Sequence, residues 1–180
     1  LVSPGRTALA QTLAPREAEL LAALDGFDGL AEFGLRISVP REAALGEIAR
    51  TAPAIAREIR ALAGAGQAAH YRRIELGRRV ADALAMARAS AEAEVVAALT
   101  PHVREIKPLP AEEDIEVLRA AVLLPLDGQS RFEAALEAAT GALHALAPDA
   151  EPQIRLVGPA PVSSFFTLRI ADAPAPAVAG

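Results

Sequence analysis

The sequence predicts an α+β fold, an antiparallel sheet with packed helices, from three patterns in its 180 residues. Apolar side chains recur at steps of three and four over 68–99, which is the spacing of one face of a long helix. Residues 33–39 alternate between apolar and polar positions, which is the period of a half-buried strand. Residues 115–126 fit a helix or a strand buried on both faces, and Pro125 with the flanking turn signals favours the strand.

The chain before residue 41 contributes one helix and one strand to this prediction. Leucines over 15–24 follow helical spacing, and Asp25-Gly26 ends that helix. The alternating strand then ends at Pro40. Because one helix and one strand cannot close a core alone, we interpret residues 1–40 as the C-terminal part of an N-terminal α+β module.

Residues 41–66 are predicted to form a helical linker. Apolar residues recur at steps of three and four, but Pro53 prevents one uninterrupted helix. We therefore expect two helices, with Thr51 capping the second and Pro53 in its first turn. The spacing also resembles a coiled coil, but it covers too few heptads, which favours local packing.

The long helix at 68–99 is the element around which the rest of the chain is organised. At about 1.5 Å per residue it spans roughly 45 Å, so it either backs a sheet along its whole length or bridges two modules. Glu75 and Arg79 are spaced as an i,i+4 ion pair on its polar side. Gly77 inside the helix reflects either tolerated drift or close packing against a neighbouring backbone.

The elements after this helix complete the predicted C-terminal domain, residues 67–172. A short strand at 103–107 precedes the buried strand, and Ser130 to Glu133 has the pattern of a capping box that opens another helix. Strands at 154–156 and 162–170 follow, joined by a rigid Gly-Pro-Ala-Pro turn.

The predicted order from residue 68 is α-β-β-α-β-β, a ferredoxin-like variant led by a helix, with both helices on one sheet face. The Ala/Pro-rich tail at 173–180 is expected to be disordered.

Composition excludes several classes of function. The net charge of -5 and the single lysine, Lys107, argue against nucleic-acid binding, which needs a basic surface. The absence of cysteine excludes disulfides and thiolate chemistry and permits a reducing cytoplasm. No apolar run reaches the roughly 18 residues that cross a bilayer. Leu1 is not an initiator methionine, so we expect a fragment or a trimmed product.

The sequence predicts no catalytic, cofactor-binding or metal site. The three histidines, His70, His102 and His144, lie near expected helix ends without a second histidine at i+3 or i+4, whereas zinc needs three or four ligands. The acidic run at 112–114 is interpreted as a solvated loop, and Ser163-Ser164 lacks the Gly-x-Ser-x-Gly elbow of a nucleophile.

Two surface clusters are candidate partner-binding residues. Phe165 and Phe166 are consecutive, so in a strand they point to opposite sheet faces, and one of them emerges on the face that the helices leave uncovered. This face, or an exposed edge strand, is the expected partner site; the alternative is that the N-terminal module covers the face. Arg78 and Arg79 could bind an anionic partner, although such pairs are more often solvated and answered by nearby acids.

Several segments resemble the gas vesicle protein GvpF/GvpL family, in order and at matching spacing. The stretch Ile74 to Val80 is similar to the family's long-helix signature, and the buried run at 118–126 is similar to its central strand. Phe132 opens the next helix in the matching place. The segment 155–165 resembles the family's strand, Gly-Pro-x-Pro-Pro-Tyr-Ser-Phe turn and final strand, and 32–37 resembles the strand that closes its N-terminal domain.

The resemblance also has departures. Val162 and Ser163 stand where the family has Pro and Tyr. The family's N-terminal strands are missing, so the chain resembles a member truncated at its N-terminus.

The resemblance implies a prokaryotic accessory protein of gas vesicle assembly, located at the gas vesicle or in the cytoplasm. It implies two α+β domains, no enzymatic activity and no cofactor. The implied partners are the shell protein GvpA and other accessory proteins, with neither nucleic acid nor membrane. The alternative is a small-ligand-binding or regulatory ferredoxin-like module.

Overall fold

A four-stranded antiparallel sheet forms the centre of the computed structural model, which describes residues 5–113 and 115–167. This confirms the predicted fold class. The strands lie in the order β2-β3-β1-β4. Their bounds are β1 Leu30–Ser38, β2 Glu105–Pro108, β3 Glu116–Pro125 and β4 Gln153–Ala160.

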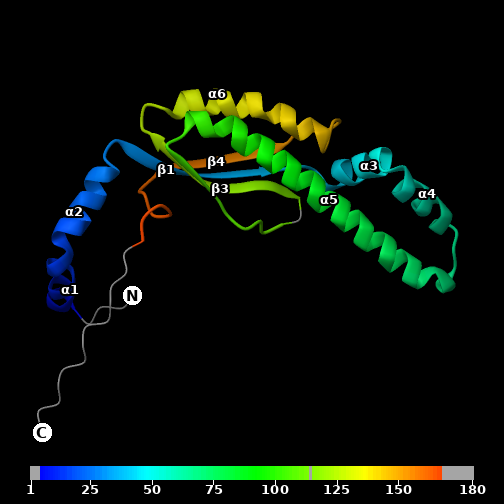
Figure 1. Ribbon diagram of the computed structural model, residues 1–180, viewed down its shortest axis with the longest axis horizontal. Coiled ribbons are helices and arrows are strands. Elements are labelled where there is room, and N and C mark those ends of the chain that lie inside the picture. Colours follow the sequence, from blue (N-terminus) through cyan, green and yellow to red (C-terminus); the bar gives the residue numbers. More distant parts are fainter. Residues whose placement is uncertain (1–4, 114, 168–180) are drawn as a thin grey trace, which may run out of the picture.

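The helices gather on one face of the sheet and at its two ends (Figure 1). Helices α5 and α6 lie side by side over the sheet, whereas α3 and α4 pack along the part of α5 that extends beyond it. Short 3₁₀ turns flank α5 and follow α6. The bounds are α1 Arg6–Leu13, α2 Glu17–Gly26, α3 Arg41–Thr51, α4 Pro53–Leu62, α5 His70–Leu99 and α6 Gln129–Ala139.

Strand β1 lies inside the sheet, which corrects the predicted domain division. It pairs antiparallel with β3 on one side and with β4 on the other, so that Leu35 stands between Ala120 and Leu156. The assignment of this strand to a separate module of residues 1–40 is therefore wrong. A strand predicted from its own alternation carries no information about its neighbours, and here both neighbours are more than 75 residues away in sequence.

The element order differs from the predicted α-β-β-α-β-β for the same reason. From β1 onward the strands and the two sheet-covering helices follow β-α-β-β-α-β, in which β3 lies between the parallel pair β1 and β2. This is the order of a split β-α-β unit. The strand expected at 162–170 is not present over 162–167, and 168–170 lie outside the described residues, as does the tail 173–180.

Helix α5 confirms the predicted long helix but divides its contacts between two surroundings. Its C-terminal half buries Leu84, Ala91, Val95 and Leu99 in the main core with β3 and α6. Its N-terminal half packs on α3 and α4 instead. The helix therefore backs the sheet with its C-terminal half only, and not along its whole length.

Several local predictions need correction at the helix ends. Thr51 does not cap α4, because its hydroxyl donates a hydrogen bond to the carbonyl oxygen of Glu47 one turn earlier. The capping box at Ser130 does not form, since α6 already begins at Gln129, whose side-chain amide donates to Glu133. The expected Gly-Pro-Ala-Pro turn is strand instead, because β4 runs on to Ala160 with a bulge opposite β1.

The core lies between the sheet and the α5–α6 layer. The buried rows come from the two inner strands, with Phe33 and Leu35 from β1 and Val122 and Leu124 from β3, and α6 supplies Phe132. The outer strands β2 and β4 add only partly buried side chains. Strand β3 is buried along most of its length, in agreement with its dense apolar run. None of the described helices is long and apolar enough to span a membrane.

Candidate partner-binding surfaces

The titratable side chains of the described residues do not assemble into a metal site, since no group of three or more ligand-type residues occurs there. His102 and His144 are exposed. The ring of His70 packs edge-on against Tyr71, with 5.9 Å between the ring centroids. The chemistry of the described surface therefore comes from ion pairs and exposed apolar groups.

An acid–arginine network occupies the face of the sheet opposite the helices. Arg36 of β1 donates a hydrogen bond of 2.6 Å to Glu112, which also pairs with Arg119 of β3. Nε of Arg36 lies 2.7 Å from Oε1 of the buried Glu116, outside hydrogen-bond geometry. The Arg119 and Arg36 guanidinium groups hold the pKa of Glu112 below its usual value. The acidic loop predicted to be solvated is thus anchored to the sheet.

Residues 161–167, which we call the strap, cross the same face near β2. The Glu32 carboxylate accepts hydrogen bonds from the backbone amides of Ser163 (2.7 Å) and Ser164 (2.8 Å) and from the Ser164 hydroxyl (2.6 Å). Lys107 donates to the carbonyl oxygen of Ser164 at 2.8 Å. Burial raises the pKa of Glu32, but the hydrogen bonds from Ser163 and Ser164 outweigh this effect of burial. The pKa of Glu32 is therefore lowered.

Phe165 and Phe166 lie in the strap rather than in a strand. Both are half-buried, so the predicted alternation of one ring into the core and one out of it does not apply. The signal that could have corrected the prediction is Ser163-Ser164, because consecutive serines offer backbone and hydroxyl donors to one carboxylate. The strap leads from the end of β4 past Glu32 of β1 to Lys107 of β2, and both rings follow directly after Ser164.

The outer edge of β4 is open among the described residues, because β4 pairs only with β1. Val157 is 60% exposed, and Ile154 is also exposed. An unpaired strand edge presents backbone donors and acceptors to an incoming strand. The opposite edge is the four-residue β2, which ends in Pro108.

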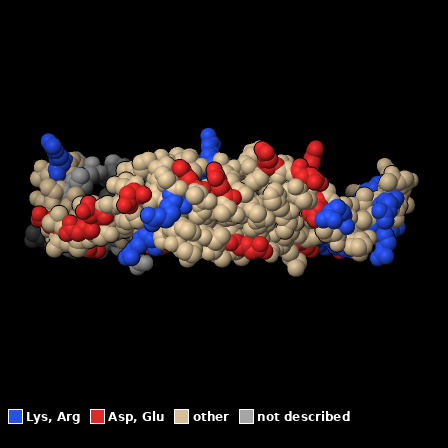
Figure 2. Space-filling view, turned by 90° about the horizontal axis from the view of Figure 1, so that it is seen from above, with Lys and Arg blue, Asp and Glu red and all other residues tan. Residues whose placement is uncertain are grey.

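Arg78 and Arg79, the predicted cationic pair, have different partners. Arg78 makes an exposed ion pair of 3.4 Å with Glu75. Arg79 instead bridges α5 to Glu58 of α4, so the predicted pair of Glu75 with Arg79 is wrong. Lys and Arg side chains gather at this end of the molecule, at the right of Figure 2.

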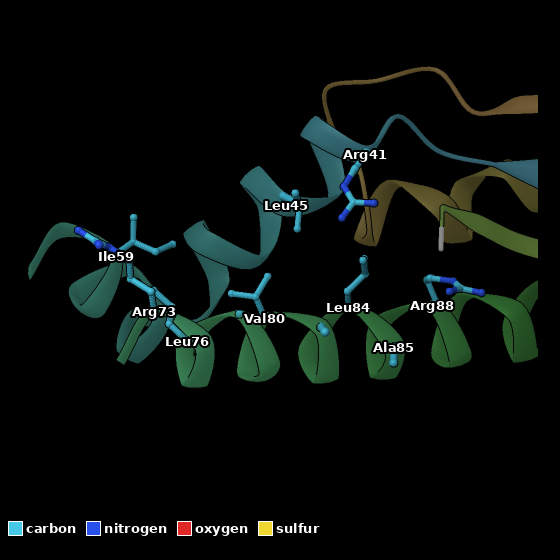
Figure 3. A pocket seen from close by; sticks show the side chains of 11 residues that line it. Arg41, Leu45, Ile59, Arg73, Leu76, Val80, Leu84, Ala85 and Arg88 are labelled. Carbon is cyan, nitrogen blue, oxygen red and sulfur yellow. The ribbon is translucent and has the colours of Figure 1, made fainter. Parts of the chain in front are cut away.

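A groove lies between α5 and the α3–α4 pair, with a volume of about 450 Å³. Figure 3 shows Leu45, Val80 and Leu84 extending into the space between the helices. Three arginines are also among the lining residues. This groove could not be predicted from the sequence. The apolar stripes of 41–62 and 76–84 indicate helices that pack together, but periodicity does not determine how completely two helices close on each other.

The fold and these surfaces define an α+β protein that carries its helices on one sheet face and exposes a strand edge and an apolar helical groove. The family model for the gas vesicle synthesis protein GvpL/GvpF matches residues 1–167. The chain therefore belongs to the GvpL/GvpF family of gas vesicle proteins. No curated protein matches the sequence significantly.

Solved structures of the same family share the fold. GvpF from Anabaena sp. PCC7120 matches with a TM-score of 0.69 at 19% identity, over 86% of this chain and 61% of that one. GvpF from Microcystis aeruginosa matches with a TM-score of 0.58 at 16% identity, over 81% of this chain and 58% of that one. The chain thus spans about three fifths of the length of these two proteins.

Proposed function

We propose that this protein is a non-enzymatic accessory factor of gas vesicle assembly that binds the GvpA-type shell protein through the open edge of β4 and the adjoining strap. The observation that carries the proposal is the unpaired edge of β4, with Val157 60% exposed; the strap that continues from this strand adds the half-buried Phe165 and Phe166. Membership of the GvpL/GvpF family supports the gas vesicle context.

Strand addition is the mode of binding that this surface favours. An extended segment of the partner would hydrogen-bond along the β4 edge, and side-chain contacts with Val157 and the phenylalanines would select it. Pro159 lacks a backbone N–H group, so pairing would concentrate on residues 153–157. The same site would serve at the vesicle surface in the cytoplasm.

The ionisation of the sheet-face acids supports a non-enzymatic role. A general acid at neutral pH needs a carboxyl pKa raised towards 7. The pKa of Glu112 is instead lowered by Arg119 and Arg36, which keeps the carboxylate charged. Glu112 therefore fastens a loop and is not poised as a general acid.

The two arginines at the start of α5 have separate parts in this proposal. Arg78 is 69% exposed in its side chain and can contact a second accessory protein. Arg79 is engaged with Glu58, so its contribution is to hold α4 against α5.

Co-purification of the tagged protein with its shell protein tests the proposal. Val157→Lys places a charge on the β4 edge, and Leu126→Lys is the matched control, because Leu126 is also 60% exposed but follows β3 at another part of the surface. We expect V157K to reduce captured shell protein at least tenfold and L126K to leave it unchanged. Phe165→Asp, checked for folding by circular dichroism, should also reduce capture.

Capture that is absent for the unmodified protein, or equal for V157K and L126K, would contradict the assignment of this edge to the shell protein.

A further inference from the structure

The groove between α5 and the α3–α4 pair has a floor of small residues. Gly77, Ala81 and Ala85 line it at steps of four along α5 and are all exposed. No atom lies within 4 Å of the position that a Cβ on Gly77 would take, so the close packing considered for this glycine is absent within the described residues. A row at i and i+4 is the ridge against which a second helix packs, and small residues let its backbone approach closely.

The walls of the groove are apolar. Leu45 from α3 and Ile59 from α4 face Leu76 and Val80 from α5 across the space shown in Figure 3. Ile59 is 42% exposed. A helix laid along the floor would bury these side chains, as amphipathic helices do in apolar grooves.

The charges around the groove are of one sign. Arg41, Arg73 and Arg88 line it, and no acidic residue does among those described. Arg73 donates to the carbonyl oxygen of Ala65, and among the described ion pairs neither Arg73 nor Arg88 has a carboxylate partner. Nε of Arg88 is buried without a hydrogen-bond acceptor, which costs free energy until an acceptor is supplied.

The segment around the groove, residues 53–82, also carries a net positive charge. Residues 53–82 contain six arginines and three acidic residues, whereas the whole chain carries -5. A carboxylate brought to this rim therefore meets a local excess of guanidinium groups, which bind carboxylates through charge-assisted hydrogen bonds.

We propose that this groove is a docking site for an acidic amphipathic α-helix of a partner protein. The apolar stripe of that helix would lie on Gly77, Ala81 and Ala85, and its flanking carboxylates would pair with Arg73 and Arg88. The site is separate from the β4 edge, so it would hold a second partner or a second segment of the same one.

Two synthetic helical peptides test the proposal by fluorescence anisotropy with the purified protein. They share one Ala/Leu stripe and differ only in the flanking positions, which are Glu in one peptide and Lys in the other. We expect the Glu peptide to bind at least tenfold more tightly. Ala81→Leu should weaken its binding at least tenfold, while Ala93→Leu, an exposed alanine of α5 outside the groove, should not.

Further variants separate loss of the groove from loss of the fold. Ala85→Leu repeats the test at a second floor position, and circular dichroism verifies that each variant is folded. Arg88→Gln should weaken binding of the Glu peptide several-fold and flatten its salt dependence, whereas Arg131→Gln, an exposed arginine of α6 outside the groove and outside 53–82, should do neither.

Equal binding of the Glu and Lys peptides, no saturable binding of the Glu peptide, or equal effects of A81L and A93L would overturn the proposal. The peptide assay contains no shell protein, so its outcome is independent of the β4 experiment.

Discussion

Replacing Gly158 with alanine tests the packing of β4 against β1. A Cβ at this position would lie 2.5 Å from Cδ1 of Phe33 and 2.9 Å from the carbonyl oxygen of Glu32. Phe33 is 1% exposed in the core, and the carbonyl belongs to the neighbouring strand, so neither can yield without moving the sheet. Overpacking of this kind costs about 1–3 kcal/mol, and we expect about 2–3 kcal/mol because both contacts are rigid.

The matched control is Gly77→Ala, where an added Cβ would meet no atom within 4 Å. Alanine is preferred over glycine inside a helix by about 1 kcal/mol, so this variant should be more stable than the unmodified protein. Urea unfolding followed by circular dichroism measures both free energies. At roughly 2–4 °C per kcal/mol for a chain of this size, G158A should lower Tm by about 4–12 °C. A change in unfolding free energy for G158A within about 0.5 kcal/mol of zero would refute the reasoning.

Burial and ionisation give three further predictions. Leu99→Ala removes a side chain that is 0% exposed and should cost about 2–5 kcal/mol in a melt, whereas Met86→Ala, 75% exposed, should cost under about 0.5 kcal/mol. Hydrogen bonds from the strap outweigh burial and lower the pKa of Glu32 from 4.5; the ionised form therefore stabilises the fold above that value, and this contribution is lost as pH falls through the folded-state pKa. Glu32→Gln should accordingly lower stability at pH 7 and flatten its decline below pH 4.5 in pH-dependent urea titrations. Arg36→Ala leaves the Glu116 carboxylate buried without its cation and should cost about 2–3 kcal/mol by the same measurement.

The sequence was sufficient for elements whose signal is local. Period-two alternation located β1, period-3.6 spacing located α5, and the bulk of the run before Pro125 identified β3 as a buried strand. Each of these three predictions rests on which faces of the element are apolar, and the order of neighbouring residues is enough to show this.

Contacts between segments that are far apart in the chain could not be predicted from the sequence. The place of β1 between β3 and β4 depends on pairing across more than 75 residues, which no local pattern records. The interaction of Glu32 with Ser163 and Ser164 spans more than 130 residues, and it turns the expected final strand into a strap over 161–167.

The residues of the candidate sites could also be predicted from the sequence only where the signal is local. Phe165 and Phe166 were identified as surface aromatics, but their setting came only from the strap. The groove rimmed by Arg73 and Arg88 depends on how far α4 stands from α5, which side-chain volumes set only in three dimensions.

Hydrogen–deuterium exchange of the protein with and without its shell protein tests most directly whether it works by binding through the β4 edge. We expect the shell protein to slow exchange in residues 153–167 and to leave the amides of α2 unchanged. Exchange in 153–167 that is identical with and without a saturating amount of shell protein would contradict it.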